Sequence, residues 1–463
     1  MRAVTAAVLA AALAGCVNLA PTYTRPASPI PAAWPLGVGV NGAAPAATID
    51  WTTFINDARL REVIKVTLRN NRDLRIAVLD IERARAQYRI ERATQFPSIG
   101  ASASAARQRT AASDGRPEST TTQYSVELGF ASYELDLFGR VRNLSQAALE
   151  TFFAFSENRR ATQISLIAEG ASVWLTLAAD SERLRLARDT LKSQQNSYEL
   201  TRRTHELGGA SGLTLAQAQT TVNAARVDVA RFTSQVALDR NALELLAGAT
   251  LRAELLPSAG VGTASLLVDV PIGVPSAVLL DRPDVLAAER LLRASNANIG
   301  AARAAFFPNI QLTATAGVAS TSLAALFRSG SGAWSFIPQI TQPIFDTGRN
   351  RATLKAARVQ RDIDIANYEK AVQIAFREVA DALAQRSTLA EQLAAQQSLT
   401  TAATRIFDLS NALFKAGSNS YLEVLDAQRS LYAAQQTLIT LRLDEQTNRI
   451  NLYKALGGGW NPT

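Results

Sequence analysis

The longest uninterrupted helical pattern in the chain runs from residue 349 to residue 416. This segment contains neither glycine nor proline and is rich in Ala, Leu, Arg, Gln and Glu, all of which favour helix. Its apolar residues recur every three or four positions, as Val372, Phe376 and Val379 do, and most positions between them are polar. A helix of this length would extend roughly 100 Å. The pattern predicts a rod that packs against partner helices along one narrow stripe.

Two other stretches alternate apolar and polar residues with a period of two, which is typical of strands. The first is a hairpin over residues 96–137, in which the alternation changes phase near Ser132 and so predicts a bulge. The second comprises strands over 309–320 and 333–344. Each strand is long enough to cross a bilayer at a tilt, which takes ~9 to 11 residues.

The order of these elements repeats. The same interval separates Gly139 from Gly348 and Gly208 from Gly417 (348 − 139 = 417 − 208 = 209). We therefore predict two tandem copies of helix, strand pair, long helix and helix. The first copy covers 51–250, with the hairpin 96–137, a long helix 140–207 and a helix 213–247. A connection covers 251–275. The second copy covers 276–457, with a helix 284–304, strands 309–320 and 333–344, a long helix 349–416 and a helix 420–456, and residues 458–463 form a tail.

The N-terminus has the pattern of an export signal. Arg2 precedes an almost unbroken apolar run that ends in Leu-Ala-Gly before Cys16, too short for a membrane-spanning helix. We interpret 1–15 as a signal peptide. Cys16 is the only cysteine, so it cannot form an internal disulfide, and its place after Leu-Ala-Gly resembles the bacterial lipobox, which implies acylation at Cys16. Residues 16–50 hold six of the 16 prolines and predict an extended strap behind that anchor.

Composition excludes several functions. The chain carries 48 Lys and Arg against 40 Asp and Glu, and loss of Arg2 with the signal leaves a net charge of +7 (47 − 40). These charges are interleaved along helical patterns, so a solvated helix face is favoured over a nucleic-acid surface. One histidine and one cysteine exclude most metal sites and His-dependent catalysis. We expect no enzyme, no cofactor and no metal.

Four strands cannot lie in lipid as an open sheet, because their edge N–H and C=O groups would be unpaired. Small membrane barrels need ~8 strands or more, so several chains must share one barrel. The predicted lipid-facing aromatic residues are Tyr124, Phe130, Trp334 and Phe336, with Ser and Thr facing a wet lumen. The alternative is that these strands form the edge of a soluble β-sandwich.

The motifs together resemble one known family, the outer-membrane factors of tripartite efflux pumps, which include TolC-like and OprM/NodT-like lipoproteins. The resemblance covers residues 16–460 and depends on the lipobox, the duplication and four motifs: Leu137-Phe138-Gly139-Arg140, Leu280-Asp281-Arg282-Pro283-Asp284-Val285, Phe306-Phe307-Pro308 and Tyr421-Leu422-Glu423-Val424-Leu425-Asp426 with the residues that follow. It implies a mainly α fold with a membrane β part. Three chains would pool twelve strands into a barrel and twelve helices into a periplasmic tunnel, with 251–275 in an equatorial belt.

The resemblance also implies a gate. Leu422 and Asp426 match residues that narrow the pore in OprM-like members, and Glu423 and Asp426 match the paired acids of TolC. A ring of carboxylates attracts cations and stores like-charge repulsion. The alternative is that both acids merely charge the first turn of a helix, which is favourable near its N-terminus. Phe414 and Thr214 replace the tyrosine–aspartate link of TolC, so that latch is not expected.

The remaining expectations concern partners. By resemblance, the helix turns would contact a periplasmic adaptor at Gly208, Gly209, Ser211, Gly417, Ser418 and Asn419. Conduction would be passive, with an inner-membrane pump of the resistance-nodulation-division type supplying substrate and energy, and with the barrel in outer-membrane lipid. Two alternatives are a non-conducting lipoprotein scaffold and the channel of an ATP-driven type I secretion system. The sequence does not identify the exported substrate.

Overall fold

The computed structural model describes residues 17–35, 49–112, 115, 117–258, 260, 267–268 and 275–458. The contacts divide the chain into two compact units. Unit 1 comprises Met1–Ala27, Leu79–Ser156 and Ala287–Glu369, and unit 2 comprises Ser28–Val78, Glu157–Leu286 and Lys370–Thr463. Each unit takes segments from both sequence repeats, so neither repeat is a unit by itself. The predicted signal peptide and Cys16 lie outside the described residues.

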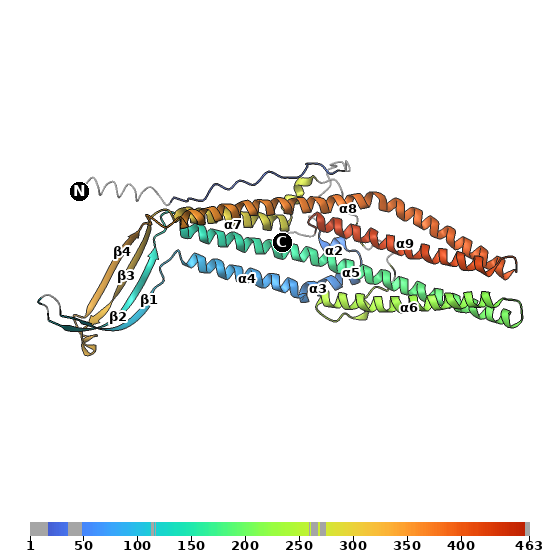
Figure 1. Cartoon of the computed structure of the whole chain (residues 1–463), viewed down its shortest axis with the longest axis horizontal. Coiled ribbons are helices and arrows are strands. Elements are labelled where there is room, and N and C mark those ends of the chain that lie inside the picture. Colours follow the sequence, from blue (N-terminus) through green and yellow to red (C-terminus); the bar gives the residue numbers. More distant parts are fainter. Residues whose placement is uncertain are drawn as a thin grey trace. The chain divides into compact units, whose positions relative to one another are not determined.

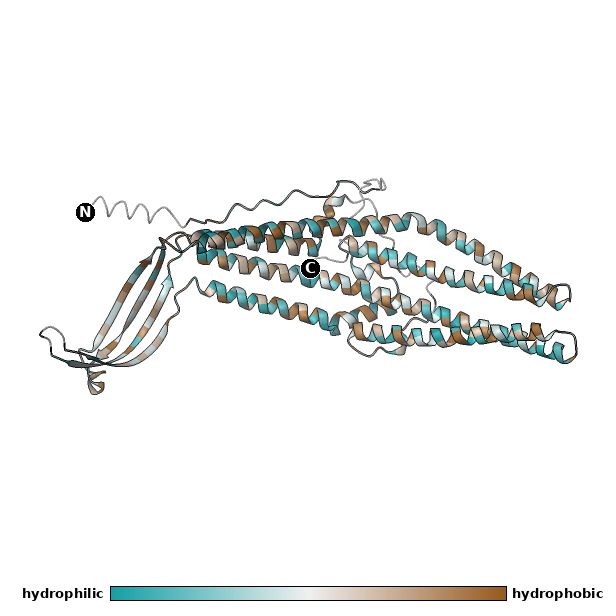
Figure 2. Ribbon diagram, in the orientation of Figure 1, coloured by the Kyte–Doolittle hydropathy of each residue, from teal (hydrophilic) through white to brown (hydrophobic). Residues whose placement is uncertain are grey.

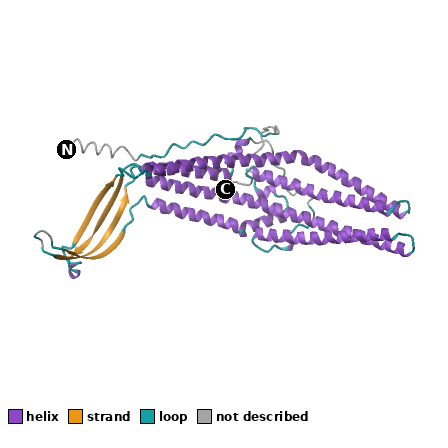
Figure 3. Cartoon of the chain, in the orientation of Figure 1, coloured by secondary structure: helices purple, strands orange, loops and turns teal. Residues whose placement is uncertain are grey.

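Helices make up most of the described chain (Figure 3). They are α2 (Trp51–Phe54), α3 (Ala58–Asn70), α4 (Arg72–Ala93), α5 (Arg140–Glu206), α6 (Gly212–Ala247), α7 (Pro283–Ala304), α8 (Arg349–Lys415) and α9 (Tyr421–Ala455), with short 3-10 turns η2 (Ala253–Leu255), η3 (Ser276–Asp281) and η4 (Leu323–Ala325). The two long helices, α5 and α8, have 67 residues each, which corresponds to about 100 Å of helix. Their predicted bounds agree with the structure to within one residue.

The prediction that the first copy begins with a single helix is wrong. Three helices, α2, α3 and α4, precede its strands, and a polar side chain caps the start of each. Asp50 accepts a hydrogen bond from the Thr52 amide, and Asp57 accepts one from the Leu60 amide. Asn71 accepts one from the Leu74 amide and also donates to the carbonyl of Leu246 at the end of α6. The breaks follow from these caps and from that tertiary contact.

The strands form one antiparallel sheet in the order β1-β2-β3-β4 (Figure 1). Their bounds are β1 (Gly100–Thr110), β2 (Ser119–Glu134), β3 (Asn309–Ser320) and β4 (Gly332–Thr341). The register between β2 and β3 shifts between Phe130 and Tyr133, and Ser132 has a φ of 55°, so the predicted bulge is confirmed. β4 ends three residues before the predicted position 344, because its last residue, Thr341, pairs with Asn309, where the neighbouring strand β3 begins.

The two faces of this sheet differ in chemistry. On the polar face, Ser104 and Ser125 share a hydrogen bond of 2.8 Å between their hydroxyl oxygens, and Thr315 and Ser335 do the same. Residues directly opposite each other in the register lie on one face, so the other face can be listed from the pairing. This apolar face includes Ala101, Ala103, Ala105, Tyr124, Val126, Leu128, Phe130, Ala314, Ala316, Val318, Trp334 and Phe336.

The backbone confirms the predicted duplication. Three pairs of glycines at the 209-residue interval have positive φ: Gly139 and Gly348, Gly208 and Gly417, and Gly248 and Gly457. A positive φ is costly for residues with a Cβ, so each pair marks a turn that both copies make in the same way.

Unit 2 is held together where helix ends meet. Trp174 of α5 is buried and donates its indole N–H to the carbonyl of Leu255 at 3.0 Å. Arg282, only 6% exposed, bonds the carbonyl of Ala455 and pairs with Asp284 and Glu378. The Leu-Asp-Arg-Pro-Asp motif therefore ties the start of α7 to α8 and to the end of α9.

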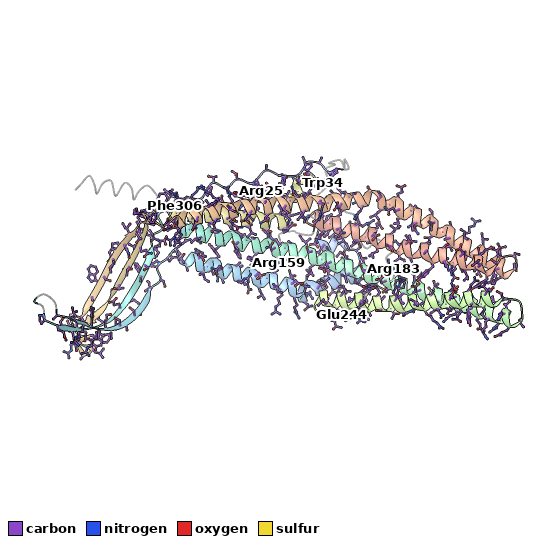
Figure 4. All side chains as sticks on the ribbon, viewed as in Figure 1. Arg25, Trp34, Arg159, Arg183, Glu244 and Phe306 are labelled. Carbon is purple, nitrogen blue, oxygen red and sulfur yellow. The ribbon has the colours of Figure 1, made fainter. Side chains whose placement is uncertain are left out.

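The described part of the strap, residues 17–35, is extended, as predicted, and contacts both units. In unit 1, the buried carboxylate of Glu289 on α7 accepts hydrogen bonds from Tyr23 and Arg25 of the strap, and Arg25 is labelled in Figure 4. In unit 2, Trp34 of the strap stacks on Phe376 of α8 with ring centroids 5.0 Å apart. The strap is thus a packed part of each unit and not a loose tether.

Figure 2 shows hydrophobic and hydrophilic residues interleaved along the long helices. No helix in the described part of the chain combines the length and the hydropathy needed to cross a membrane.

Candidate gate and hairpin tips

The first turns of α9 divide into a buried and an exposed stripe. Tyr421, Val424 and Leu425 are buried, whereas Leu422, 56% exposed, and Asp426 face outward. The difference follows from the helical period, because residues three and four positions apart share a face. Ser420 caps this helix by accepting a hydrogen bond from the amide of Glu423.

The exposed stripe lines a groove of about 640 Å³ between α8 and α9. Its lining residues are Ala403, Ile406 and Ser410 of α8 and Leu422, Glu423, Asp426, Ala427, Arg429 and Ser430 of α9. The structure thus brings the three predicted gate residues together in one groove. The groove combines apolar walls, two carboxylates and one guanidinium, so it can interact with ions that pass along it.

The buried stripe fixes the position of the groove. Tyr421, Val424 and Leu425 pack with Ala218 of α6 into an apolar cluster, against which Tyr198 of α5 and Phe407 and Phe414 of α8 also pack. Phe414 contacts the Tyr421 ring with centroids 5.4 Å apart. Phe414 therefore makes an apolar contact with the start of α9.

Polar contacts continue this attachment along α9. Tyr432 donates a hydrogen bond of 3.1 Å to the carboxylate of Asp228 on α6, and Gln428 donates one to Ser193 on α5. Burial, reinforced by the negative charge of Asp228, raises the pKa of Tyr432 to about 12. The phenol thus stays protonated at neutral pH and remains a donor. Movement of the groove relative to α5 and α6 would break these contacts.

The turn that joins α5 to α6 and the turn that joins α8 to α9, here called the hairpin tips, have the same backbone geometry. In the first, the amide of Gly209 donates to the carbonyl of Thr204, and in the second the amide of Ser418 donates to the carbonyl of Leu413. Both bonds reach back five residues across a glycine with positive φ, which is a common way to close a helix. Ser211 caps α6 by accepting from the amide of Thr214. Leu207 beside the first tip is 88% exposed, so this tip offers an apolar contact surface.

The predicted lipid-facing aromatic residues share one face. Tyr124, Phe130, Trp334 and Phe336 all belong to the apolar face of the sheet, and Trp334 is 81% exposed. The predicted lipidation residue, Cys16, lies outside the described residues. Within the described ranges, no group of three or more His, Cys, Asp or Glu residues is placed to hold a metal ion.

Sequence reasoning did not include Arg429, Ile406 or the other α8 residues in the groove. Arg429 follows Asp426 by three positions and shares its helix face, so the helical period alone could have identified it. The α8 residues carry no such signal, because their position opposite α9 depends on how the two helices are staggered.

A family model described as "Outer membrane efflux protein" matches residues 63–249 and 274–458 of this chain. The two matched ranges correspond to the two sequence repeats.

Individual proteins match over nearly the whole chain. The toluene efflux pump outer membrane protein TtgC of Pseudomonas putida is 46% identical, covering 98% of this chain and 95% of the relative. A crystal structure described as a membrane protein from Pseudomonas aeruginosa has a TM-score of 0.90 at 42% identity, covering 96% of this chain and 98% of that one. The open state of the Neisseria gonorrhoeae MtrE outer membrane channel has a TM-score of 0.86 at 37% identity, with the same coverages.

Proposed function

This chain belongs to the outer membrane efflux protein family, and we propose that the groove at the start of its α9 is the gate of that family's channel. The protein is an outer-membrane channel of a tripartite efflux pump, with a helical tunnel in the periplasm, and it works with an adaptor and an inner-membrane pump. Relatives named as efflux pump components favour this function over a scaffold or a type I secretion channel.

One observation carries the gate proposal: the exposed stripe of Leu422, Glu423 and Asp426 lines a single groove with α8. In an assembly with helices around a lumen, copies of this stripe would form a ring. Carboxylates in such a ring attract cations and repel one another, so the ring is both selective and easy to widen. Glu423 also lies in the first turn of α9, where its charge interacts favourably with the helix N-terminus. Asp426 is therefore the stronger gate residue.

The experiment is a single-channel measurement in planar bilayers. Asp426→Ala should raise the conductance of the resting channel by about twofold and lower its preference for cations, because each copy loses one of its two groove carboxylates and the bulk of that side chain.

Asp444→Ala is the matched control. Asp444 is also exposed and lies five helical turns further along α9 on the same side of the helix. Unchanged conductance and selectivity in Asp426→Ala, or an equal change in both variants, would show that the groove is not the gate.

The finer features of the assembly are proposals too. Three copies would supply twelve strands, since one sheet has four and a small barrel needs ~8 or more. The apolar face with its aromatic residues would contact lipid, and an acylated Cys16 would anchor the strap. The tips at Gly208, Gly209, Ser211, Gly417, Ser418 and Asn419 would receive the adaptor, which the exposed Leu207 supports. A resistance-nodulation-division transporter would supply the substrate.

A further inference from the structure

The four strands carry only two basic residues, and both belong to β1. Arg107 lies opposite Thr122 of β2, and Arg109 lies opposite Thr120. Alternation along a strand puts both arginines on the face that holds Ala105 and the other apolar side chains. The same face carries the uncharged polar residues Thr120, Thr122 and Ser320 near this end. The two arginines are thus its only cations, and both lie at the end of the sheet beside the β1–β2 turn.

The two arginines differ in their contacts. Arg109 pairs with Glu118 at 2.6 Å, and both side chains are largely exposed. Arg107 is exposed and has no hydrogen-bond or ion-pair partner within the described part of the chain. Glu118 therefore occupies part of the Arg109 guanidinium, whereas all the N–H groups of the Arg107 guanidinium are available to bind a ligand.

The depth of these residues follows from the register. Ala105 lies opposite Tyr124, and Arg107 is two residues further toward the turn, a distance of roughly 7 Å along the strand. On a membrane strand, aromatic residues mark the boundary between hydrocarbon and headgroups. The two guanidinium groups therefore lie at the level of the lipid headgroups and point away from the lumen. This step rests on the proposed function, since it requires the apolar face to contact lipid.

The identity of the leaflet follows from the connections. The strand ends that lead to helices are at Gly100, Glu134, Asn309 and Thr341, and the turn after Thr110 is at the opposite end. With the helices in the periplasm, the turn end faces the outer leaflet. The outer leaflet of such a membrane is built from a phosphorylated glycolipid. Guanidinium groups bind phosphate through two parallel hydrogen bonds and remain charged at any physiological pH.

We propose that Arg107 and Arg109 form a binding surface for the phosphate groups of the outer-leaflet glycolipid. Arg107 makes the main contact, and Glu118 holds Arg109 beside it. The function of the surface is to fix the barrel to specific lipids at its outer rim, independently of the lipid anchor at the chain's N-terminus.

The test measures retained lipid on the purified, full-length protein. Preparations in detergent are incubated with bis-phosphorylated lipid A, with dephosphorylated lipid A or with inorganic phosphate, and bound molecules are counted by native mass spectrometry. Wild type should retain the bis-phosphorylated lipid at least about fivefold more than either other probe. R107Q should lose most of this preference, R107K should keep part of it, and the double variant R107Q/R109Q should lose it completely.

The matched control is R226Q, which removes an exposed arginine from α6. It should retain lipid A like wild type. Equal retention of phosphorylated and dephosphorylated lipid A by wild type, or unchanged retention by the double variant, would overturn the proposal. The conductance of the same preparations in planar phospholipid bilayers tests the channel function separately from the lipid preference. If pores form without a lipid preference, only this inference fails, and if wild type forms no pores, the channel function itself fails.

Discussion

At the scale of single residues, Asp239 of α6 has an environment that makes its ionisation depend on pH near neutrality. It is 8% exposed, accepts a hydrogen bond from Gln235 and lies beside Asp180 of α5. Asp180 in turn pairs with Arg183, labelled in Figure 4, whose guanidinium also donates to Thr440 of α9. Burial, together with the neighbouring carboxylate of Asp180, raises the pKa of Asp239 to about 6. Near neutral pH, two carboxylates therefore repel each other inside this helix pair.

This environment predicts a pH dependence of stability. An unfolded aspartate has a pKa near 4, so between about pH 4 and pH 6 the folded chain holds one more proton than the unfolded chain. The free energy of unfolding contributed by Asp239 should be greatest below this window and should fall as the pH rises through it. Asp239→Asn should remove that part of the dependence, because the amide can donate to Asp180 at every pH.

Thermal unfolding in detergent, followed by circular dichroism at several values between pH 4 and pH 7, measures this effect. The informative quantity is the slope of the melting temperature against pH, compared between the variant and wild type. Asp444→Asn, an exposed position on α9, should keep the wild-type slope. The wild-type slope in Asp239→Asn would mean that the Asp239 carboxyl group does not take up its proton in this pH range.

The gate residues and their neighbours show how far sequence reasoning reaches at this scale. Leu422, Glu423 and Asp426 could be assigned to one exposed face because the period of a single helix determines it. The buried hydrogen bonds to the Glu289 carboxylate could not be predicted, because the donors Tyr23 and Arg25 are more than 260 positions away in the sequence. Contacts of that kind depend on where the strap lies on α7, which no local pattern encodes.

At the scale of elements, each hairpin tip depends on one glycine with a positive φ, so a single substitution can test it. Gly208 and Gly417 have φ values of 77° and 74°, and an added Cβ at either would meet no atom within 4 Å. A methyl group there costs only backbone strain, about 1 kcal/mol.

Gly208→Ala and Gly417→Ala should therefore loosen their own tips without unfolding the protein. The amides of Gly209 and Ser418, which close the two turns, should exchange hydrogen for deuterium about fivefold faster in the respective variants. Gly212→Ala is the control, because Gly212 has equally open surroundings and no positive φ. Exchange as slow as in wild type would mean that the tips tolerate a Cβ in this conformation.

Most elements could be predicted from sequence because their signals are local. Long runs without glycine or proline define α5 and α8, and alternation defines the strands. The division of the first helical stretch at Asn71 was missed even though an asparagine three positions before Leu74 is a recognised cap. The break is stabilised by the bond from Asn71 to Leu246, which lies 175 positions further along the chain. Local helix propensity favours one continuous helix through Asn71, whereas the tertiary contact with Leu246 favours a break there.

For the whole molecule, the decisive feature is the sheet with two free edges, β1 and β4. Unpaired edge groups are too costly in lipid, so we propose that neighbouring copies pair β4 with β1 around a closed ring. Native mass spectrometry of the purified protein should give the mass of three chains, each beginning at an acylated Cys16. A monomer or dimer would contradict the shared barrel, and an unmodified N-terminus would contradict the anchor alone.

A closed ring of copies would have a genetic consequence. Every copy would complete both of its neighbours, so a cell that expresses an altered and an intact allele together would build mostly mixed rings. An allele that disturbs the groove on α9 but leaves β1 and β4 unchanged should therefore be dominant, since one altered copy changes the pore that all members of the ring share. An allele that disrupts both edge strands should instead be recessive, because its product can pair with neither neighbour and never joins the ring.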